Sequence, residues 1–159
     1  MEDKMLRTVR LIADYQFCRG AGKALFPETC EFILSSTGRI RQIVDDGVRI
    51  ATLKSDTGLL TLSIEGAIRL HRAFKYPAFR VCVSSNVSEF IAAGKSVFSK
   101  HVVDVWNEIR PGDEVIVVNE EDELLSTGRA VLSAIEMLEF MRGVAVETRQ
   151  GILKVKSKS

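Results

Sequence analysis

Short β-prone runs separated by turn signals dominate the second half of the chain, and they constrain the fold more than any other feature. These runs are Val97 to Val105, Glu114 to Val118, Leu124 to Leu132 and Val144 to Thr148. Pro111 and Gly112 occupy favourable turn positions between the first two runs, and Asn119 to Asp122 marks a further hairpin turn. Several short strands with regular turns indicate a small closed or nearly closed β-barrel.

Other signals in this half predict one more strand and two short helices. Arg80 to Val83 is β-prone. Helical spacing covers Val87 to Ala93, which Gly94 closes, and returns over Ala134 to Met141 between the last strands. A barrel with short helices fits this order of elements.

The first half has a different pattern, in which helices flank a set of hairpins. Helical spacing of apolar residues predicts an amphipathic helix over Met5 to Phe17, and Gly20 and Gly22 end it. The β-prone runs that follow are Glu31 to Ser35, Arg39 to Val44, Val48 to Lys54 and Leu59 to Leu62. A second helical pattern runs from Ile64 to Phe74, where Tyr76-Pro77 breaks it.

Asp45-Asp46-Gly47 is the strongest hairpin signal in this half, because Asp and Gly tolerate the positive φ angles of tight hairpin turns. The fold class is therefore α+β. We expect a small α+β domain over residues 1–75, followed by a β-barrel domain with short helices over residues 76–159.

The charge balance requires any nucleic-acid site to be a local patch. The 159 residues carry a formal net charge of only +1. Residues 1–75 hold 12 Lys and Arg against 9 Asp and Glu, and residues 76–159 hold 10 against 12. The negative excess of the second half is concentrated in Glu120 to Glu123, which we expect to form one exposed turn. A strongly basic, uniformly charged nucleic-acid binder is excluded.

Cysteine usage and hydropathy indicate a cytoplasmic, soluble protein. Cys18, Cys30 and Cys82 are scattered, so neither a zinc site nor a secreted disulfide scaffold is expected. The two histidines, His71 and His101, lack the spacing of metal ligands or of a nucleophile–base pair. No stretch reaches the roughly 18 to 20 apolar residues that span a bilayer. We therefore predict no metal, no cofactor and no membrane partner.

Four segments of the second half resemble a PUA domain, the RNA-binding module named after pseudouridine synthases and archaeosine transglycosylases. They are Gly94 to Val102 (GKSVFSKHV), Ile109 to Val115 (IRPGDEV), Gly128 to Ala130 (GRA) and Gly143 to Val146 (GVAV). Their order and spacing both match, over roughly residues 77 to 152. Each segment alone is weakly specific, because Pro-Gly-Asp before a β-run occurs in many barrels.

The first half resembles the pre-PUA domain that precedes PUA in archaeosine tRNA-guanine transglycosylases. The segments that carry this likeness are Ala13 to Phe17 (ADYQF), Gly20 to Pro27 (GAGKALFP) and Thr37 to Arg41 (TGRIR). The catalytic barrel and zinc site of that family would lie upstream, and nothing in this sequence corresponds to them. The resemblance therefore implies a tRNA-binding part without base-exchange machinery, and no catalytic residues.

The segment from Gly94 to His101 supplies the side chains that RNA recognition needs. Lys95 and Lys100 are cations for phosphates, Ser96 offers a hydroxyl, and Gly94 permits close backbone approach. Phe98 is either a stacking platform for an unpaired base or a core residue of the barrel, and both interpretations stay open. In the family pattern Arg129 and Arg149 border the same groove, so both are predicted phosphate contacts.

Possible further contacts lie in the first half. Arg19 and Lys23 belong to the Gly-rich loop after the first helix, which lacks the spacing of a nucleotide-binding loop. Arg39 and Arg41 alternate along one strand and so share a face. Such a pair either follows a phosphate backbone or covers the solvent side of the sheet.

The leading hypothesis is an RNA-binding accessory protein of tRNA modification that binds the acceptor end of tRNA. A separate transglycosylase catalytic chain is its possible partner. The alternative is a ribosome-associated translation factor, because pre-PUA and PUA pairs also occur in such proteins. A protein-interaction module without an RNA role is a third possibility.

Overall fold

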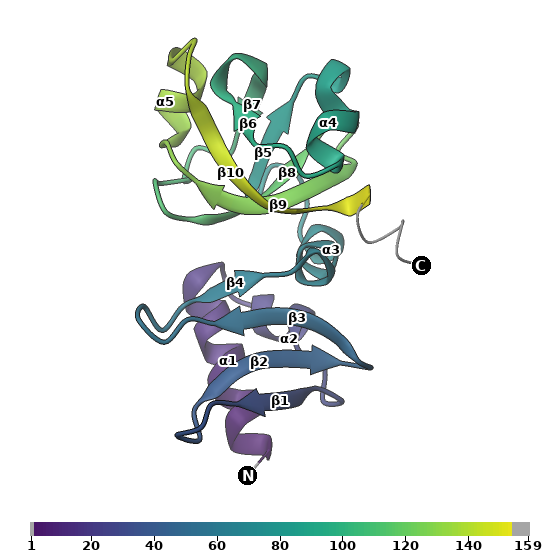
Figure 1. Cartoon of the computed structure of the whole chain (residues 1–159), viewed down its shortest axis with the longest axis vertical. Helices are drawn as coiled ribbons and strands as arrows, with labels where there is room; N and C mark the ends of the chain where they lie inside the picture. The colour runs from purple at the N-terminus through teal and green to yellow at the C-terminus, as the bar shows by residue number, and fades with distance from the viewer. Residues whose placement is uncertain (1, 154–159) are drawn as a thin grey trace. The chain divides into compact units, whose positions relative to one another are not determined.

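The chain divides into two compact units, residues 1–73 and residues 74–159. Their elements are drawn in Figure 1 from a computed structural model, which describes residues 2–153. No helix in that range is long and apolar enough to cross a membrane.

The first unit consists of a small antiparallel sheet with helices before and after it in the chain (Figure 1). Its elements are α1 (Glu2–Gln16), α2 (Ala21–Leu25), β1 (Glu31–Leu34), β2 (Ile40–Asp45), β3 (Val48–Leu53), β4 (Leu60–Leu62) and α3 (Ile64–Ala73). The strands pair in sequence order, β1-β2-β3-β4. Buried side chains from α1, the sheet and α3, such as Val9, Ile43 and Leu70, form the core.

The hairpin between β2 and β3 follows directly from its turn residues. Asp46 and Gly47 adopt φ angles of 52° and 77°, which is the conformation that tight hairpin turns require. Asp45 and Val48 are the last paired residues before the turn. The predicted hairpin is confirmed.

One element of the first unit differs from the expectation, because α2 forms where we predicted a glycine-rich loop. The Asp14 side chain accepts a hydrogen bond from the Gly22 backbone N–H at 2.8 Å. This bond satisfies an N–H of the first helical turn that has no partner within the helix. Lys23 therefore lies on a short helix and not in a loop.

The second unit is a six-stranded, nearly closed barrel sheet with short helices (Figure 1). Its elements are β5 (Arg80–Val83), η1 (Ser85–Val87), α4 (Ser88–Ala92), β6 (Val97–Phe98), η2 (Ser99–His101), β7 (Val102–Val105), β8 (Glu114–Val118), β9 (Leu124–Ala130), α5 (Ala134–Glu139) and β10 (Val144–Gly151). The strand order is β6-β10-β9-β8-β5-β7. β5 and β8 are parallel, and the other pairs are antiparallel. The predicted α+β class is confirmed.

The run predicted as one strand from Val97 to Val105 is two strands separated by the 3₁₀ turn η2. β6 pairs with β10, whereas β7 pairs with β5 at the other end of the strand order. Ser99 is buried within the turn, and its backbone N–H donates to the Gly143 carbonyl oxygen at 2.9 Å. A continuous strand cannot serve both edges, so the chain must change direction here.

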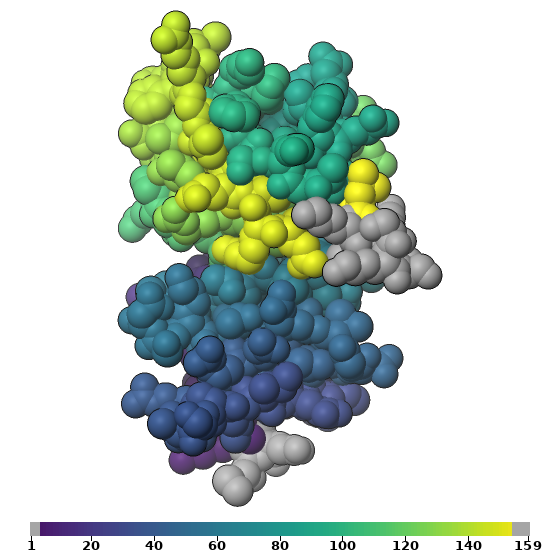
Figure 2. Space-filling model, viewed as in Figure 1, coloured from purple at the N-terminus to yellow at the C-terminus, as the bar shows by residue number. Residues whose placement is uncertain are grey.

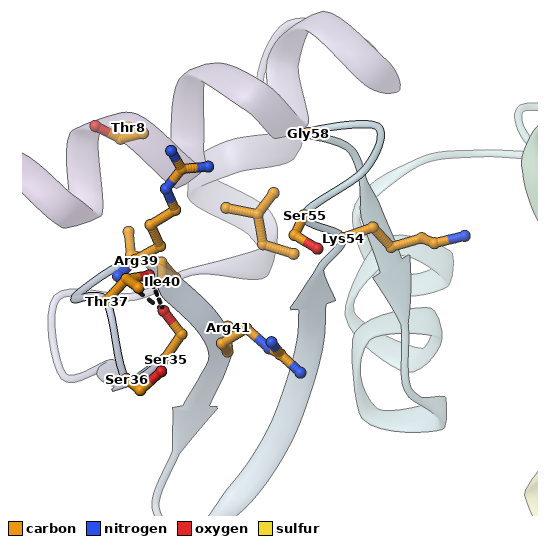
Figure 3. A pocket seen from close by; sticks show the side chains of 11 residues that line it. Thr8, Ser35, Ser36, Thr37, Arg39, Ile40, Arg41, Lys54, Ser55 and Gly58 are labelled. Carbon is orange, nitrogen blue, oxygen red and sulfur yellow. Dashed lines mark hydrogen bonds between the residues drawn. The ribbon is translucent and has the colours of Figure 1, made fainter.

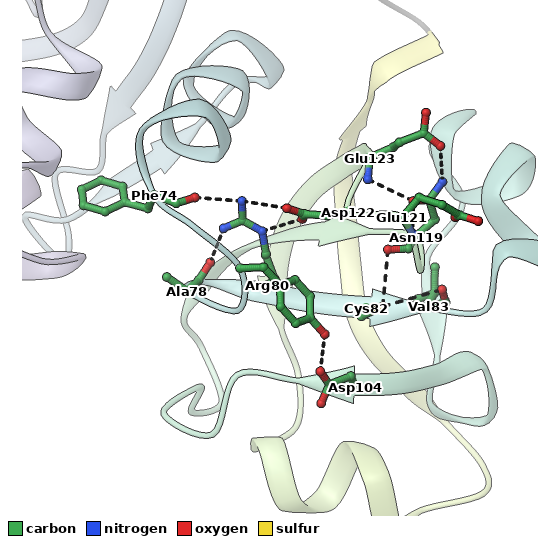
Figure 4. A network of polar contacts seen from close by, with 11 residues as sticks. Phe74, Ala78, Arg80, Cys82, Val83, Asp104, Asn119, Glu121, Asp122 and Glu123 are labelled. Atoms are coloured by element: carbon green, nitrogen blue, oxygen red, sulfur yellow. Dashed lines mark hydrogen bonds and ion pairs between the residues drawn. The ribbon is translucent and has the colours of Figure 1, made fainter.

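A buried arginine organises the start of the second unit (Figure 4). Arg80 is 1% exposed, and its guanidinium donates to the carbonyl oxygens of Phe74 (2.9 Å) and Ala78 (2.8 Å). The Arg80 Nε also donates to Asp122 Oδ1 at 2.7 Å. Because a buried charge is costly unless it is paired, this network holds the entry segment and the β8–β9 turn together.

The acidic run from Glu120 to Glu123 lies in that turn. Glu120 accepts a hydrogen bond from the Ser85 backbone N–H, and Glu121 accepts one from the Ser85 hydroxyl, both at 2.9 Å. Part of the acidity of the second half therefore stabilises loops of the barrel. Glu120 and Glu121 thus both contact Ser85, which lies in the connection between β5 and α4.

Candidate nucleic-acid interface

The segment from Gly94 to His101 begins where α4 ends. Gly94 has a φ angle of 109°, a left-handed conformation that favours glycine at the end of a helix. The backbone N–H groups of Gly94 and Lys95 donate to the carbonyl oxygens of Ile91 (2.9 Å) and Phe90 (3.1 Å). These bonds fix the direction in which the chain leaves α4 and enters β6.

Strand β10 holds this segment along its length. Val97 is paired with Val146, and Phe98 with Val144. The Thr148 hydroxyl donates to the Lys95 carbonyl oxygen at 2.9 Å. The segment is therefore an ordered edge of the barrel.

Ser96 has a structural role within this arrangement. Its hydroxyl oxygen accepts a hydrogen bond from the Thr148 backbone N–H at 3.4 Å. An hydroxyl has one hydrogen to donate in addition to accepting. The Ser96 oxygen is the acceptor in this bond, so the hydroxyl hydrogen does not take part in it.

Phe98 lies outside the core of the barrel, since its side chain is 46% exposed. The neighbouring Val97 is fully buried and supplies the apolar contact with the core. Adjacent residues of a strand point to opposite faces, which explains the difference. Lys95 and Lys100 are exposed, and neither forms an ion pair with a described residue. His101 is half-buried in η2.

The two predicted arginines of this unit are paired with carboxylates. Arg129 on β9 forms an ion pair with Glu147, its partner in the register of β10. Arg149 donates two hydrogen bonds to the buried carboxylate of Glu114 on β8, both at 2.6 Å. A phosphate must compete with these carboxylates, so each arginine is a weaker anion site than an unpaired lysine.

Figure 2 shows the residues of β10 as a yellow band across the surface of the second unit. β10 lies between β6 and β9 in the sheet. It therefore joins the strand that carries Phe98 to the strand that carries Arg129. Glu114 and Glu147 are the site-bordering residues that sequence reasoning missed, because their pairing depends on the register of three strands.

The remaining predicted contacts belong to the first unit. Arg19 is exposed between α1 and α2, and Lys23 is exposed on α2. Arg39 and Arg41 both line an open pocket at the ends of the hairpins (Figure 3). Arg41 lies on β2, whereas Arg39 lies just before that strand, so the two arginines line one pocket without sharing a face of the strand.

Comparison with protein families assigns a domain to each half of the chain. Residues 7–77 match the patch-forming domain C2 of tRNA-guanine transglycosylase, and residues 79–152 match the PUA domain. The tRNA-guanine(15) transglycosylase of Methanothermobacter thermautotrophicus is 48% identical over 147 residues, which are 92% of this chain and 22% of that protein. The same enzyme of Pyrococcus abyssi is 48% identical over 150 residues, which are 94% of this chain and 25% of that protein.

Solved structures share the fold at low sequence identity. A hypothetical protein from Pyrococcus horikoshii is 21% identical with a TM-score of 0.72, and the match covers 93% of this chain and 90% of that one. A conserved PUA domain protein from Thermoplasma acidophilum is 18% identical with a TM-score of 0.65, covering 95% and 90%.

The chain spans about a quarter of the length of the curated relatives it matches. Its two domains and its sequence correspond to the C-terminal part of those proteins. The chain is therefore a PUA-domain protein, in which a C2 domain of the tRNA-guanine transglycosylase type precedes the PUA domain.

Proposed function

We propose that this chain is an RNA-binding accessory protein of tRNA modification, which binds the acceptor end of tRNA through its PUA unit. In this proposal the base exchange is performed by a separate transglycosylase catalytic chain. The observation that carries it is the match of both domains, at 48% identity, to relatives named tRNA-guanine(15) transglycosylase. The tRNA modification in this proposal is that of the archaeosine pathway.

The exposed side chains of the Gly94–His101 segment support this role. Lys95 and Lys100 offer charge to phosphates, and Phe98 offers a flat apolar face on which an unpaired base can stack. The chain as a whole is almost neutral. Binding must then come from local cationic patches such as this one, and it must weaken steeply with salt because phosphate contacts release counterions.

The cationic part is tested with Lys95→Ala/Lys100→Ala in fluorescence-anisotropy titrations of tRNA at several salt concentrations. The control is Lys75→Ala/Arg110→Ala, which removes the same charge from exposed positions of the same unit. We expect the slope of log affinity against log salt to fall by about 1.4 to 1.8 for the first variant, at 0.7 to 0.9 per phosphate contact. Equal slopes for both variants would remove Lys95 and Lys100 from the site.

The stacking part is tested with Phe98→Ala and with tRNA that has or lacks its unpaired 3′ nucleotides. Loss of one base–aromatic stack costs about 1 to 3 kcal/mol, which is roughly a 5- to 150-fold loss of affinity. We expect this loss on intact tRNA and little effect on the truncated one. Tyr15→Ala is the control, because Tyr15 is 86% exposed in the other unit. The same loss on both RNAs contradicts acceptor-end binding.

The partner is tested by affinity purification of the tagged chain from its own cells, followed by mass spectrometry and by a guanine-exchange assay. We expect a transglycosylase catalytic chain to co-purify, and its exchange rate to rise when this chain is added. Co-purification with small ribosomal subunits in place of such a chain would support the translation-factor alternative and overturn the accessory role.

A further inference from the structure

The first unit contains an open pocket of about 620 Å³, built from connections between its strands (Figure 3). The β1–β2 loop and the start of β2 form one side, the end of β3 and the loop after it form another, and Thr8 of α1 completes the lining. The lining residues outside α1 are Ser35, Ser36, Thr37, Arg39, Ile40, Arg41, Leu53, Lys54, Ser55 and Gly58.

All the charged residues that line this pocket are cations. Arg39, Arg41 and Lys54 line it, and its described lining includes no carboxylate. Among residues 4–153, no ion pair is found for any of these three cations. By contrast, Arg129 and Arg149 of the PUA unit each form an ion pair with a carboxylate.

The three cations are spread along the pocket and do not converge on one point. In Figure 3 the Arg39 guanidinium extends toward α1, and the Arg41 guanidinium lies on the side of β3. Lys54 points outward at the rim. A single phosphate needs several donors directed at one position, whereas a polynucleotide backbone presents charges in succession. The arrangement fits the backbone better.

The β1–β2 loop supplies hydroxyl donors in a fixed conformation. The backbone N–H of Ser35 donates to the Arg39 carbonyl oxygen at 2.7 Å, and the Arg39 N–H donates to the Ser35 hydroxyl at 3.2 Å. The Ser35 and Thr37 hydroxyls are hydrogen-bonded at 3.0 Å. Ser36 and Thr37 are exposed at the tip. Little conformational entropy is then lost when the loop contacts a ligand.

We propose that this pocket binds successive phosphate groups of an RNA strand, with Arg39 and Arg41 as the main contacts and the β1–β2 loop hydroxyls as additional donors. The inference rests on the proposed RNA-binding function and adds a second contact region, in the C2 unit. The pocket would recognise phosphate groups, and these can belong to an RNA strand or to a small phosphorylated compound. The experiments below distinguish these two ligands.

The RNA source is tested with Arg39→Ala/Arg41→Ala in tRNA titrations over a range of salt concentrations. The control, Arg49→Ala/Arg72→Ala, removes two exposed arginines of the same unit that do not line the pocket. We expect the salt slope of the pocket variant to fall by about 1 to 2 relative to the control, since each lost phosphate contact lowers it by roughly one. Circular dichroism of both variants establishes that they fold.

The second arm titrates the ¹⁵N-labelled protein with inorganic phosphate and with pyrophosphate, and follows the backbone amide signals of Ser36, Thr37 and Arg39. Shifts of these signals, together with the reduced salt slope, support the proposal. Shifts of these signals without any change in the salt slope of RNA binding contradict RNA as the ligand and indicate a small phosphorylated compound. Absence of both effects overturns the phosphate site altogether.

Failure here is distinguishable from failure of the proposed function. If Lys95→Ala/Lys100→Ala weakens tRNA binding while Arg39→Ala/Arg41→Ala behaves as its control, the function stands and the pocket is excluded from it. If the wild-type protein does not bind tRNA, both RNA roles fall.

Discussion

Individual charged residues of this protein have two distinct roles, which burial and pairing separate. Arg80 is almost completely buried and satisfied by carbonyl oxygens and a carboxylate. Lys95 and Lys100 are exposed, and the structure assigns them no ion pair with a described residue. The first kind stabilises the fold, and the second is available to a ligand.

Replacing Arg80 tests the structural role. Arg80→Met removes the guanidinium and leaves the Phe74 and Ala78 carbonyl oxygens without their partner. We expect a loss of about 2 to 4 kcal/mol in the free energy of unfolding, measured by urea denaturation. Arg110→Met, at an exposed position of the same unit, is expected to change it by less than about 0.5 kcal/mol. Similar values for the two variants would contradict the network.

Asp45 makes the stability of the first unit depend on pH. A hydrogen bond from the Thr29 hydroxyl, followed by one from the Arg69 guanidinium, lowers the pKa of Asp45 below its ordinary value of 3.8. A carboxyl whose pKa is lower in the folded state stabilises the fold above the unfolded pKa, and this contribution is lost as pH falls through the folded pKa.

The corresponding experiment compares wild type with Asp45→Asn in urea denaturation between pH 6 and pH 2. We expect the wild type to be more stable at pH 6 and the difference to shrink below the ordinary pKa of 3.8. Thr29→Ala should reduce the same difference, because it removes the largest cause of the shift. A difference that is constant over this pH range would refute the assignment.

At the scale of elements, strand β10 is the one on which the candidate interface depends. It holds β6 on one side and β9 on the other. The approach to β9 is close at Gly128, where an added Cβ would lie 2.1 Å from the Glu147 carbonyl oxygen. Only glycine permits this spacing, which explains its position in the Gly-Arg-Ala segment.

Gly128→Ala tests this packing. The methyl group must push β9 and β10 apart, and overpacking of this kind costs about 1 to 3 kcal/mol. Ser126→Ala on the same strand is the control, since the buried Ser126 hydroxyl has no hydrogen-bond partner among the described residues. We expect thermal unfolding to be shifted down for Gly128→Ala and nearly unchanged for Ser126→Ala. Equal midpoints would show that the strands relax without cost.

The whole molecule consists of two units, each with a core of its own. The second unit buries a continuous cluster that includes Val81, Val117, Met137 and Val146. The Arg80 network also lies within residues 74–159, because its partners Phe74, Ala78 and Asp122 all belong to that range. The core cluster and the Arg80 network therefore both lie within the second unit.

A fragment of residues 74–159 is expected to fold by itself and to unfold cooperatively in urea. It should bind tRNA more weakly than the full chain, with a smaller salt slope, because it lacks the Arg39 and Arg41 pocket. Binding by the fragment should still depend on Lys95 and Lys100. A fragment without a cooperative transition would show that the second unit needs the first.

The local signals in the sequence determined much of this architecture. Asp45-Asp46-Gly47 specifies a hairpin because those residues accept positive φ, and alternating or helical spacing located most helices and strands to within a few residues. The order of the PUA-type segments identified the family. These properties depend on residues that are neighbours in the chain, so they can be read without the fold.

Tertiary structure alone decided the features that depend on contacts between distant residues. α2 forms because Asp14 reaches Gly22, and the strand after Val97 breaks at Ser99 because β6 and β7 pair with different neighbours. The same holds for the site: register places Glu147 opposite Arg129, and the pleat turns Phe98 outward. Strand register fixes which charges are neutralised, and it is set by packing across the whole unit, which no local pattern encodes.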